Sequence, residues 1–182
     1  MNFWVFAGAA ILFACIVVLA NYTVQYPVLG TPLTYGALTY PLSFLLMDIL
    51  SEKYNKPQVL KTLWVGLLLA FIPSLLASEA RIAIASVCAF FISQNLDVHL
   101  FYYLKNCFPS LGWLRNNAST MISQFIDTMI FFHIAFLFIY PWEQVMAMLL
   151  ADFCIKAFLA LCDTPFFYVF AIRKSKPKIH TK

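Results

Sequence analysis

The chain has 182 residues, of which 63% are hydrophobic and 11% charged, and its formal net charge is +4. Soluble domains contain about 25% charged residues, and a chain of this size folded in water buries only part of its surface. Lipid can cover the apolar excess, so the composition excludes an ordinary soluble domain and predicts one membrane-embedded domain over residues 1–182.

A helix needs roughly 20 mostly apolar residues to cross a bilayer. The apolar runs of this chain are continuous, which argues against a barrel, whose strands alternate with a period of two. The sequence therefore predicts an all-α integral membrane protein, a bundle of six transmembrane helices at residues 3–20, 33–50, 60–76, 82–104, 118–139 and 145–172.

Two prolines fall inside predicted spans. Proline lacks the amide hydrogen that a helix interior uses, and its ring clashes with the preceding turn. Pro41 in the second span and Pro165 in the sixth are therefore predicted to bend or break their helices. The loop before the second span contains Pro27, Gly30 and Pro32, and it is interpreted either as a lid or as a plain connector.

The basic residues orient the chain. Cytoplasmic segments of membrane proteins carry an excess of Lys and Arg, so both termini are predicted to be cytoplasmic. These residues lie in short inter-helix segments and the tail, so their charge does not indicate a nucleic-acid partner. The inner segments then hold ten of the twelve Lys and Arg: Lys53, Lys56, Lys61, Lys105, Arg115, Arg173, Lys174, Lys176, Lys178 and Lys182.

Sequence motifs for catalysis and metal binding are missing. The five cysteines include no C-x-x-C pair, and the three histidines form no H-x-x-x-H or H-E-x-x-H pair. The sequence also contains no Walker motif, Gly-rich phosphate loop or G-x-S-x-G. It therefore predicts no metal site, no cofactor and no enzymatic activity.

Charges inside the apolar segments are the most informative feature of the sequence. An isolated charge at the bilayer centre costs on the order of 2.5–3.5 kcal/mol. Lys156 lies near the middle of the sixth span, and Arg81 adjoins the outer end of the fourth. Such groups must pair with one another or line a wet cavity. The predicted spans also contain five aspartates: Asp48, Asp97, Asp127, Asp152 and Asp163.

The fourth and fifth spans each place small residues and a carboxylate on one face, because steps of four residues keep to one side of a helix. Small residues let helices approach closely, so one interpretation is a packing seam. The stripes are Arg81, Ala85, Ala89, Ser93 and Asp97, and Ser119, Ser123 and Asp127.

A short pattern, S-Q-x-[LI]-D, occurs in both of these spans. It contains Gln94 and Asp97 in the fourth span, and Gln124 and Asp127 in the fifth. Consecutive spans run in opposite directions, so the two copies are predicted to flank one pocket. A chance similarity over five residues is the alternative.

Lys156 has several candidate partners. Asp152 lies four residues before it and can pair along the helix. Asp163 lies two turns beyond it on roughly the same face, and Asp97 or Asp127 can approach from neighbouring spans. One interpretation is an ion network that fixes helix register. We favour a functional site, because buried ion pairs add little stability.

Paired Asp and Gln side chains suit a particular class of ligand. A carboxylate accepts two parallel N–H bonds, and a glutamine amide both donates and accepts. These groups on facing helices suit a planar heterocycle with an N–H/NH₂ edge, such as a guanine-type base, with Phe101 and Phe125 as stacking surfaces. Proton relay is the other common use of intramembrane carboxylates, and Asp97 and Asp127 are candidates for either role.

Four blocks of the sequence form a specific set: residues 41–54 with the run Asp48-Ile49-Leu50-Ser51-Glu52-Lys53-Tyr54, residues 93–101, residues 113–128 and residues 156–166. This set, in this order, resembles the queuosine precursor transporter family, which stands near the vitamin uptake transporters. Asn55 departs from the family, which usually has Gly there. Because Asn tolerates a left-handed turn, the inner loop is expected to keep its conformation.

The resemblance implies import of 7-deazaguanine bases, the cyano and aminomethyl precursors of queuosine, across the bacterial inner membrane for tRNA queuosine salvage. Gln94, Asp97, Gln124 and Asp127 would address the base. Lys156 with Asp163 would organise the carboxylates, Arg81 would gate the outer mouth, and Asn117 belongs to the most distinctive block. The predicted substrate-binding residues are therefore Gln94, Asp97, Gln124, Asp127, Lys156, Asp163, Asn117 and Arg81.

The alternative is a substrate-binding subunit of an ATPase-coupled vitamin or nucleobase uptake system. Such a subunit docks through small-residue helix faces, for which Ala10 and Ala14 are candidates. An ATPase module is the less favoured partner, and a homodimer is left open.

Overall fold

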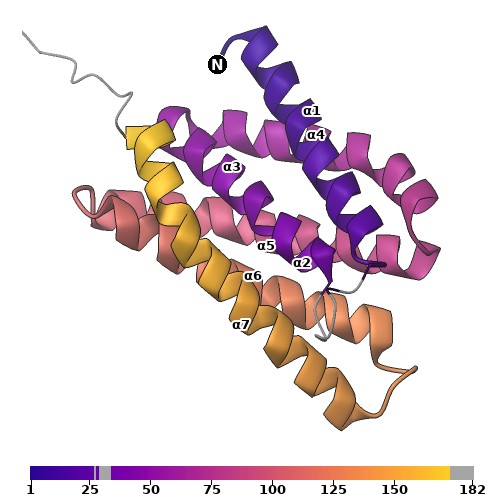
Figure 1. Cartoon of the computed structure of the whole chain (residues 1–182). Helices are drawn as coiled ribbons and strands as arrows, with labels where there is room; N and C mark the ends of the chain where they lie inside the picture. The colour runs from indigo at the N-terminus through magenta and orange to yellow at the C-terminus, as the bar shows by residue number, and fades with distance from the viewer. Residues whose placement is uncertain (27, 29–33, 173–182) are drawn as a thin grey trace, which may run out of the picture.

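The computed structural model describes residues 1–26, 28 and 34–172, which are helical throughout apart from the connections. The predicted lid or connector at Pro27, Gly30 and Pro32, and the basic tail, lie outside the described residues. The elements are α1 (Phe3–Thr23), α2 (Tyr35–Thr39), α3 (Pro41–Lys53), α4 (Lys56–Ala77), α5 (Ala80–Cys107), α6 (Gly112–Phe136), α7 (Trp142–Phe167) and the π-helix η1 (Tyr168–Ile172) (Figure 1).

Five helical segments are long and apolar enough to cross a membrane: α1, α4, α5, α6 and the continuous run Trp142–Ile172. They confirm the predicted all-helical membrane class. The predicted second span at 33–50 is not one helix, since the described part of it is divided between α2 and α3.

Pro41 causes this division. It occupies the first turn of α3 and has no amide hydrogen to donate to the preceding turn. The Ser43 hydroxyl donates to the Tyr40 carbonyl oxygen at 2.8 Å, next to the break. Tyr40 keeps helical dihedral angles, so α2 leads directly into α3. Pro165, predicted to act in the same way, does not end α7; the helix changes to π-type bonding only at Tyr168.

The inner loops differ from prediction in two respects. Asn55 is not left-handed: it has φ −84° and forms the extended N-cap of α4. The fifth predicted span begins earlier, at Gly112 rather than at residue 118. Arg115, predicted to lie in a cytoplasmic loop, is buried inside α6 because its guanidinium pairs with the Glu52 carboxylate.

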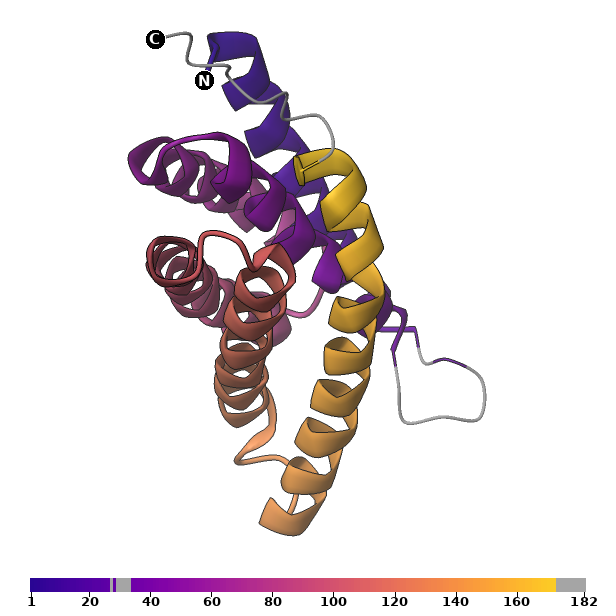
Figure 2. The same cartoon turned by 90° about the vertical axis from the view of Figure 1, so that its left-hand side faces the viewer.

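The broken helix α2–α3 lies at the centre of the bundle. α3 contacts α1 and α4 on one side and α5, α7 and η1 on the others, while α5 and α6 pack along each other. Figure 2 shows the N-terminus of α1 and the end of η1 at one end of the molecule, and the α6–α7 connection at the opposite end. Side chains of α3 therefore lie where the packed helices converge.

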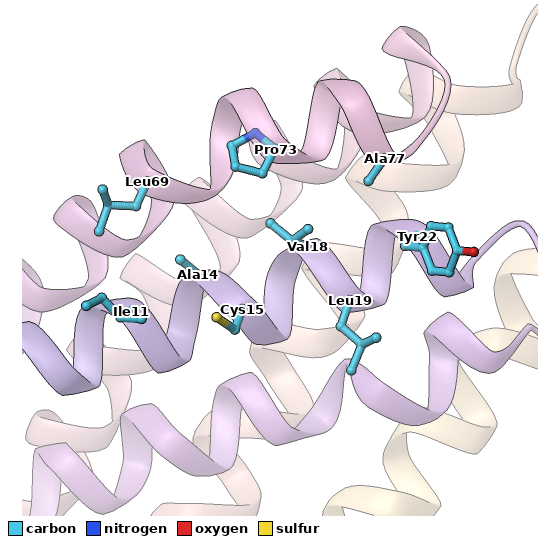
Figure 3. A pocket seen from close by; sticks show the side chains of 9 residues that line it. All are labelled: Ile11, Ala14, Cys15, Val18, Leu19, Tyr22, Leu69, Pro73 and Ala77. Carbon is cyan, nitrogen blue, oxygen red and sulfur yellow. The ribbon is translucent and has the colours of Figure 1, made fainter.

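The outer surface of the bundle is apolar, as lipid contact requires. Leu68, Leu76 and Phe138 are among its most exposed side chains. A groove of about 640 Å³ runs between α1 and α4 and is lined by Ile11, Ala14, Cys15, Val18, Leu19, Tyr22, Leu69, Pro73 and Ala77 (Figure 3). This lining suits lipid chains and offers a polar solute almost nothing to bind.

The small-residue face of α1 is already occupied. Ala10 is 1% exposed and Ala14 is 8% exposed. A Cβ atom added to Gly66 of α4 would lie only 3.1 Å from the Ala10 carbonyl oxygen, so the two helices are in close contact there. The predicted docking face for an ATPase module is therefore covered by α4.

The α1–α4 contact generates a stability prediction. A Cβ atom added to Gly66 of α4 would also lie 2.7 Å from Cδ1 of Phe13 in α1. A Cβ atom added to Gly8, which is in α1 as well, would have nothing within 4 Å. Gly66→Ala should lower the free energy of unfolding by about 1–3 kcal/mol through overpacking. Gly8→Ala should not, since alanine is the better helix former. Thermal unfolding in detergent measures both, and equal melting temperatures would contradict the close contact.

Candidate functional site

The α5–α6 interface is built from the two predicted stripes. Every member from Ala85 onward is fully buried, whereas Arg81 remains partly exposed at the outer end of α5. The interpretation of the stripes as a packing seam is thus confirmed. Each stripe also carries its carboxylate into the interior, so Asp97 and Asp127 lie among packed helices and not in lipid.

A first polar cluster surrounds Lys156, and we call it the lysine cluster. The Lys156 ammonium lies 2.7 Å from Oδ2 of Asp152 and 3.6 Å from Oδ2 of Asp127. Thr128 Oγ1 lies 3.5 Å from both the ammonium and the Asp152 carboxylate. Ser93 of α5 donates to Oδ1 of Asp127 at 2.9 Å. The predicted pairing of Lys156 with Asp152 and Asp127 is therefore present.

Tyr40 completes the lysine cluster, although the sequence analysis did not single it out. Its hydroxyl donates to Oδ1 of Asp127 at 3.4 Å, and its ring centroid lies 4.2 Å from the Lys156 ammonium. The other face of the ring stacks on Phe90 at 4.2 Å. A cation over a desolvated aromatic face gains about 2 kcal/mol. The position of Tyr40 directly before Pro41, at a predicted helix break, is the feature of the sequence that could have pointed to it.

A second cluster lies around Asp48 of α3 and Asp97 of α5, which are side by side; we call it the carboxylate pair. Thr120 of α6 donates to Oδ2 of Asp48 at 2.9 Å. A cavity of about 10 Å³, enough for one water molecule at most, adjoins Asp48. Its lining includes Thr120, Asn116 and Asp163.

The two glutamines of the repeated pattern are fully buried and incompletely bonded. Gln94 donates from Nε2 to the Ser43 hydroxyl at 3.0 Å, and its Oε1 has no hydrogen-bond partner among the described residues. Neither Nε2 nor Oε1 of Gln124 has one. Buried amides are almost always satisfied, so these two side chains keep a hydrogen-bonding capacity that the described residues do not meet.

A cavity of about 400 Å³ opens at the outer end of the bundle. Arg81 and Glu79 stand at its rim, 3.4 Å apart, and Asp152 lies at its inner end. A second, narrower cavity shares Asp152 and Phe131 with it and has Lys156 in its wall. Arg81 thus lies at the mouth of this cavity, and the cavity reaches the lysine cluster at Asp152.

Three predicted or candidate residues lie elsewhere. Asn117 exchanges hydrogen bonds of 2.9 and 3.0 Å with Thr164 and so ties α6 to α7. Asp163 is half-buried and lines the small cavity beside Asp48, so it does not join Lys156. Phe125 lies at the surface, edge-on to Phe153, and is no stacking surface for a buried ligand.

A third polar group, the inner lock, joins the inner ends of α3, α5 and α6. Arg115 binds Glu52 in a bidentate fashion, with N–O distances of 3.1 and 2.9 Å. Lys105 lies 3.5 Å from the same carboxylate and donates to the Ser51 and Glu52 carbonyl oxygens. Bidentate Arg–carboxylate pairs are among the stronger charged contacts, so this group ties the three helices together.

Comparison with known proteins identifies the family. A family model described as "putative vitamin uptake transporter" matches residues 73–170. A Bacillus subtilis (strain 168) protein named "probable queuosine precursor transporter" is 34% identical over 173 residues, covering 81% of this chain and 75% of the relative. The chain therefore belongs to the queuosine precursor transporter family. The "queuosine precursor transporter" of Escherichia coli (strain K12) is 30% identical over 172 residues, covering 78% of this chain and 75% of the relative.

No solved structure matches the chain. The family membership and the five long apolar helices make it a multi-pass membrane protein of a transporter family. Among the described residues, no group of three or more His, Cys, Asp or Glu side chains is arranged to hold a metal ion.

The lysine cluster generates a stability prediction. Removing one partner from a buried ion network leaves an uncompensated charge and costs about 3–5 kcal/mol. Lys156→Gln should therefore strongly lower the melting temperature in detergent, because Asp127 and Asp152 lose their cation. Adding Asp127→Asn and Asp152→Asn to Lys156→Gln should restore most of the loss. A triple variant no more stable than the single one would show that charge compensation is not the cause.

Proposed function

We propose that the chain imports 7-deazaguanine bases, the cyano and aminomethyl precursors of queuosine, across the bacterial inner membrane for tRNA queuosine salvage. The observation that carries this proposal is the buried, unbonded Gln124 amide between two sets of buried carboxylates, in a chain whose relatives are named for these precursors. No enzymatic step is part of this function, and the chain acts as one transmembrane domain.

The proposed topology has six crossings with both termini in the cytoplasm. Residues 35–53 of α2 and α3 rise about 1.5 Å each, and the resulting length of about 28 Å approaches the thickness of the hydrocarbon core. Counting α2–α3 as one crossing brings the inner lock and the basic residues that flank the α3–α4 and α5–α6 connections to the cytoplasmic side. The 400 Å³ cavity then opens to the outside.

The proposed binding site lies between α5 and α6, below the outer cavity. A 7-deazaguanine presents adjacent ring N–H and NH₂ donors, which a carboxylate accepts as two parallel bonds. Asp127 is held ready for this role by Lys156, and Asp97 offers two unbonded oxygens. Gln94 and Gln124 supply the amide groups that read the remaining edge of the base, including its carbonyl oxygen.

The other predicted residues act around this site. Arg81 at the rim attracts and gates solute, and Lys156 fixes the Asp127 carboxylate. Asn117 holds α6 against α7, and Asp163 provides an acceptor on the inner side of the carboxylate pair. The chain works without an ATPase module, which agrees with the covered small-residue face of α1.

A rescue assay tests the function. The chain would be expressed in bacteria lacking both queuosine-precursor synthesis and their own importer, with the cyano base supplied at low concentration. We expect queuosine to return to tRNA, as measured by boronate-gel retardation. Asp127→Asn should abolish rescue at normal membrane levels, and Glu143→Gln, the same change at an exposed position, should not. Absence of rescue by the parent, verified in the membrane, would refute the proposal unless a co-purified ATPase is found.

Replacing Gln124 should affect binding of the base without lowering the stability of the protein. An unbonded buried amide contributes nothing to folding, so Gln124→Leu should leave the melting temperature unchanged or raise it. The same variant should weaken uptake of the base roughly 10- to 100-fold, because it loses hydrogen bonds to the ligand worth about 1–3 kcal/mol.

Gln144→Leu, at an exposed position on α7, is the matched control for both measurements. If Gln124→Leu destabilises the protein and leaves uptake at the parental level, the amide has a structural partner and does not face the base.

A further inference from the structure

The carboxylate pair differs from the lysine cluster in having no ion-pair partner among the residues that the structure describes. Asp48 is 1% exposed and Asp97 is 0% exposed, and the two side chains are adjacent. Two neighbouring negative charges in an apolar interior repel each other and lack solvation. At least one carboxyl must therefore be neutralised by something it binds.

The hydrogen bonds of the pair leave room for such a ligand. Thr120 donates to Oδ2 of Asp48, but Oδ1 of Asp48 and both oxygens of Asp97 have no hydrogen-bond partner among the described residues. Ser119 lies beside Asp97, yet its hydroxyl hydrogen is directed to the Arg115 carbonyl oxygen at 2.7 Å. Three buried carboxyl oxygens thus remain available.

The charged groups packed around the pair do not supply the missing cation. On α6 and α5, Arg115 and Lys105 are bound to Glu52, which itself lies one turn beyond Asp48 on α3. On α7, Asp163 lines the cavity next to Asp48 and adds a further acid, while Lys156 is bound by the aspartates of the lysine cluster. Each of these three basic groups of the described part of the chain is already paired elsewhere.

The size of the site favours a proton over a sodium ion as the ligand of the carboxylate pair. A sodium ion needs several oxygen ligands around one point and the space to hold it. The cavity beside Asp48 measures about 10 Å³, and Asp97 is not part of its lining. A proton requires no such volume and can be shared between two carboxyl groups, which then titrate as one unit.

We propose that Asp48 and Asp97 form a proton-binding site that couples proton entry to base import. Building on the proposed function, the loaded state has one proton shared by Asp48 and Asp97 while the base is bound at Asp127 and the glutamines. The small cavity joins Asp48 to the half-buried Asp163, which provides the inner route for proton release. After the proton and the base have left on the inside, the carrier returns empty, and the pair takes up the next proton from outside before the next base binds.

Purified protein in liposomes tests this inference. The labelled cyano base is used because it carries no charge, and potassium with valinomycin holds the membrane potential at zero. A gradient of one pH unit, acidic outside, should drive accumulation of up to about tenfold for one proton per base. A pH-sensitive dye in the lumen should report acidification when the base is added outside.

Asp97→Asn and Asp48→Asn should each abolish accumulation and the dye response. Asp48→Asn should retain equilibrium exchange of labelled for unlabelled base, because its side chain is not assigned to the base. Glu143→Gln is the matched control and should behave as the parent. Retained exchange also shows that the variant is folded.

The outcomes distinguish this inference from the proposed function. Absence of exchange by the parent protein would overturn the proposed function itself. Exchange without any response to the pH gradient, or accumulation driven by sodium instead, would overturn the proton site alone. The proton site would also be overturned if Asp48→Asn still accumulated the base against its gradient.

Discussion

The structure depends above all on how Lys156 is accommodated inside the membrane. A lone ammonium at this depth is costly, and here Asp152, Asp127 and the Tyr40 ring surround it. Asp152 belongs to the same helix, but Asp127 comes from α6 and Tyr40 from the break between α2 and α3. Neutralising one lysine therefore requires three helices to meet at one point, and it fixes their mutual register. Asp152 belongs to the lysine cluster and also lines the outer cavity, so the cavity ends at this cluster.

The two carboxylates of the α5–α6 seam occupy equivalent places and have different surroundings. Asp127 has a lysine, a serine and a tyrosine as partners, whereas Asp97 has another acid beside it and no hydrogen-bond partner among the described residues. Small residues at the seam bring both into the interior without strain, because they allow the helix backbones to approach closely. A repeated sequence pattern thus yields one charge-compensated carboxylate and one carboxylate whose oxygens no described residue neutralises.

Local spacing explains which parts of this arrangement were predictable. The membrane class, the two stripes and the Asp152–Lys156 pair follow from composition and from the helical period. Asp163 shows the limit of such reasoning: seven residues return almost to the same face, but they also advance about 10.5 Å along the axis. That rise takes Asp163 from the lysine cluster to the cavity beside Asp48. Tyr40 and the Asp48–Asp97 contact involve distant parts of the chain and a helix break, so no spacing rule could have predicted them.

The polar contacts of α3 and its leading residue Tyr40 connect both ends of the site. At about one contact per turn, this helix is tied to its neighbours through Tyr40 to Asp127, Ser43 to Gln94, Asp48 to Thr120 and Glu52 to Arg115. Because Pro41 removes one helical hydrogen bond, α3 can tilt relative to α2 at little cost in backbone bonding. A tilt of α3 that separated Glu52 from Arg115 would also displace the contacts at Tyr40 and Ser43, because all of them lie on the same helix or on its leading residue. Under the proposed function, this shared helix is what links the outer cavity to the inner lock.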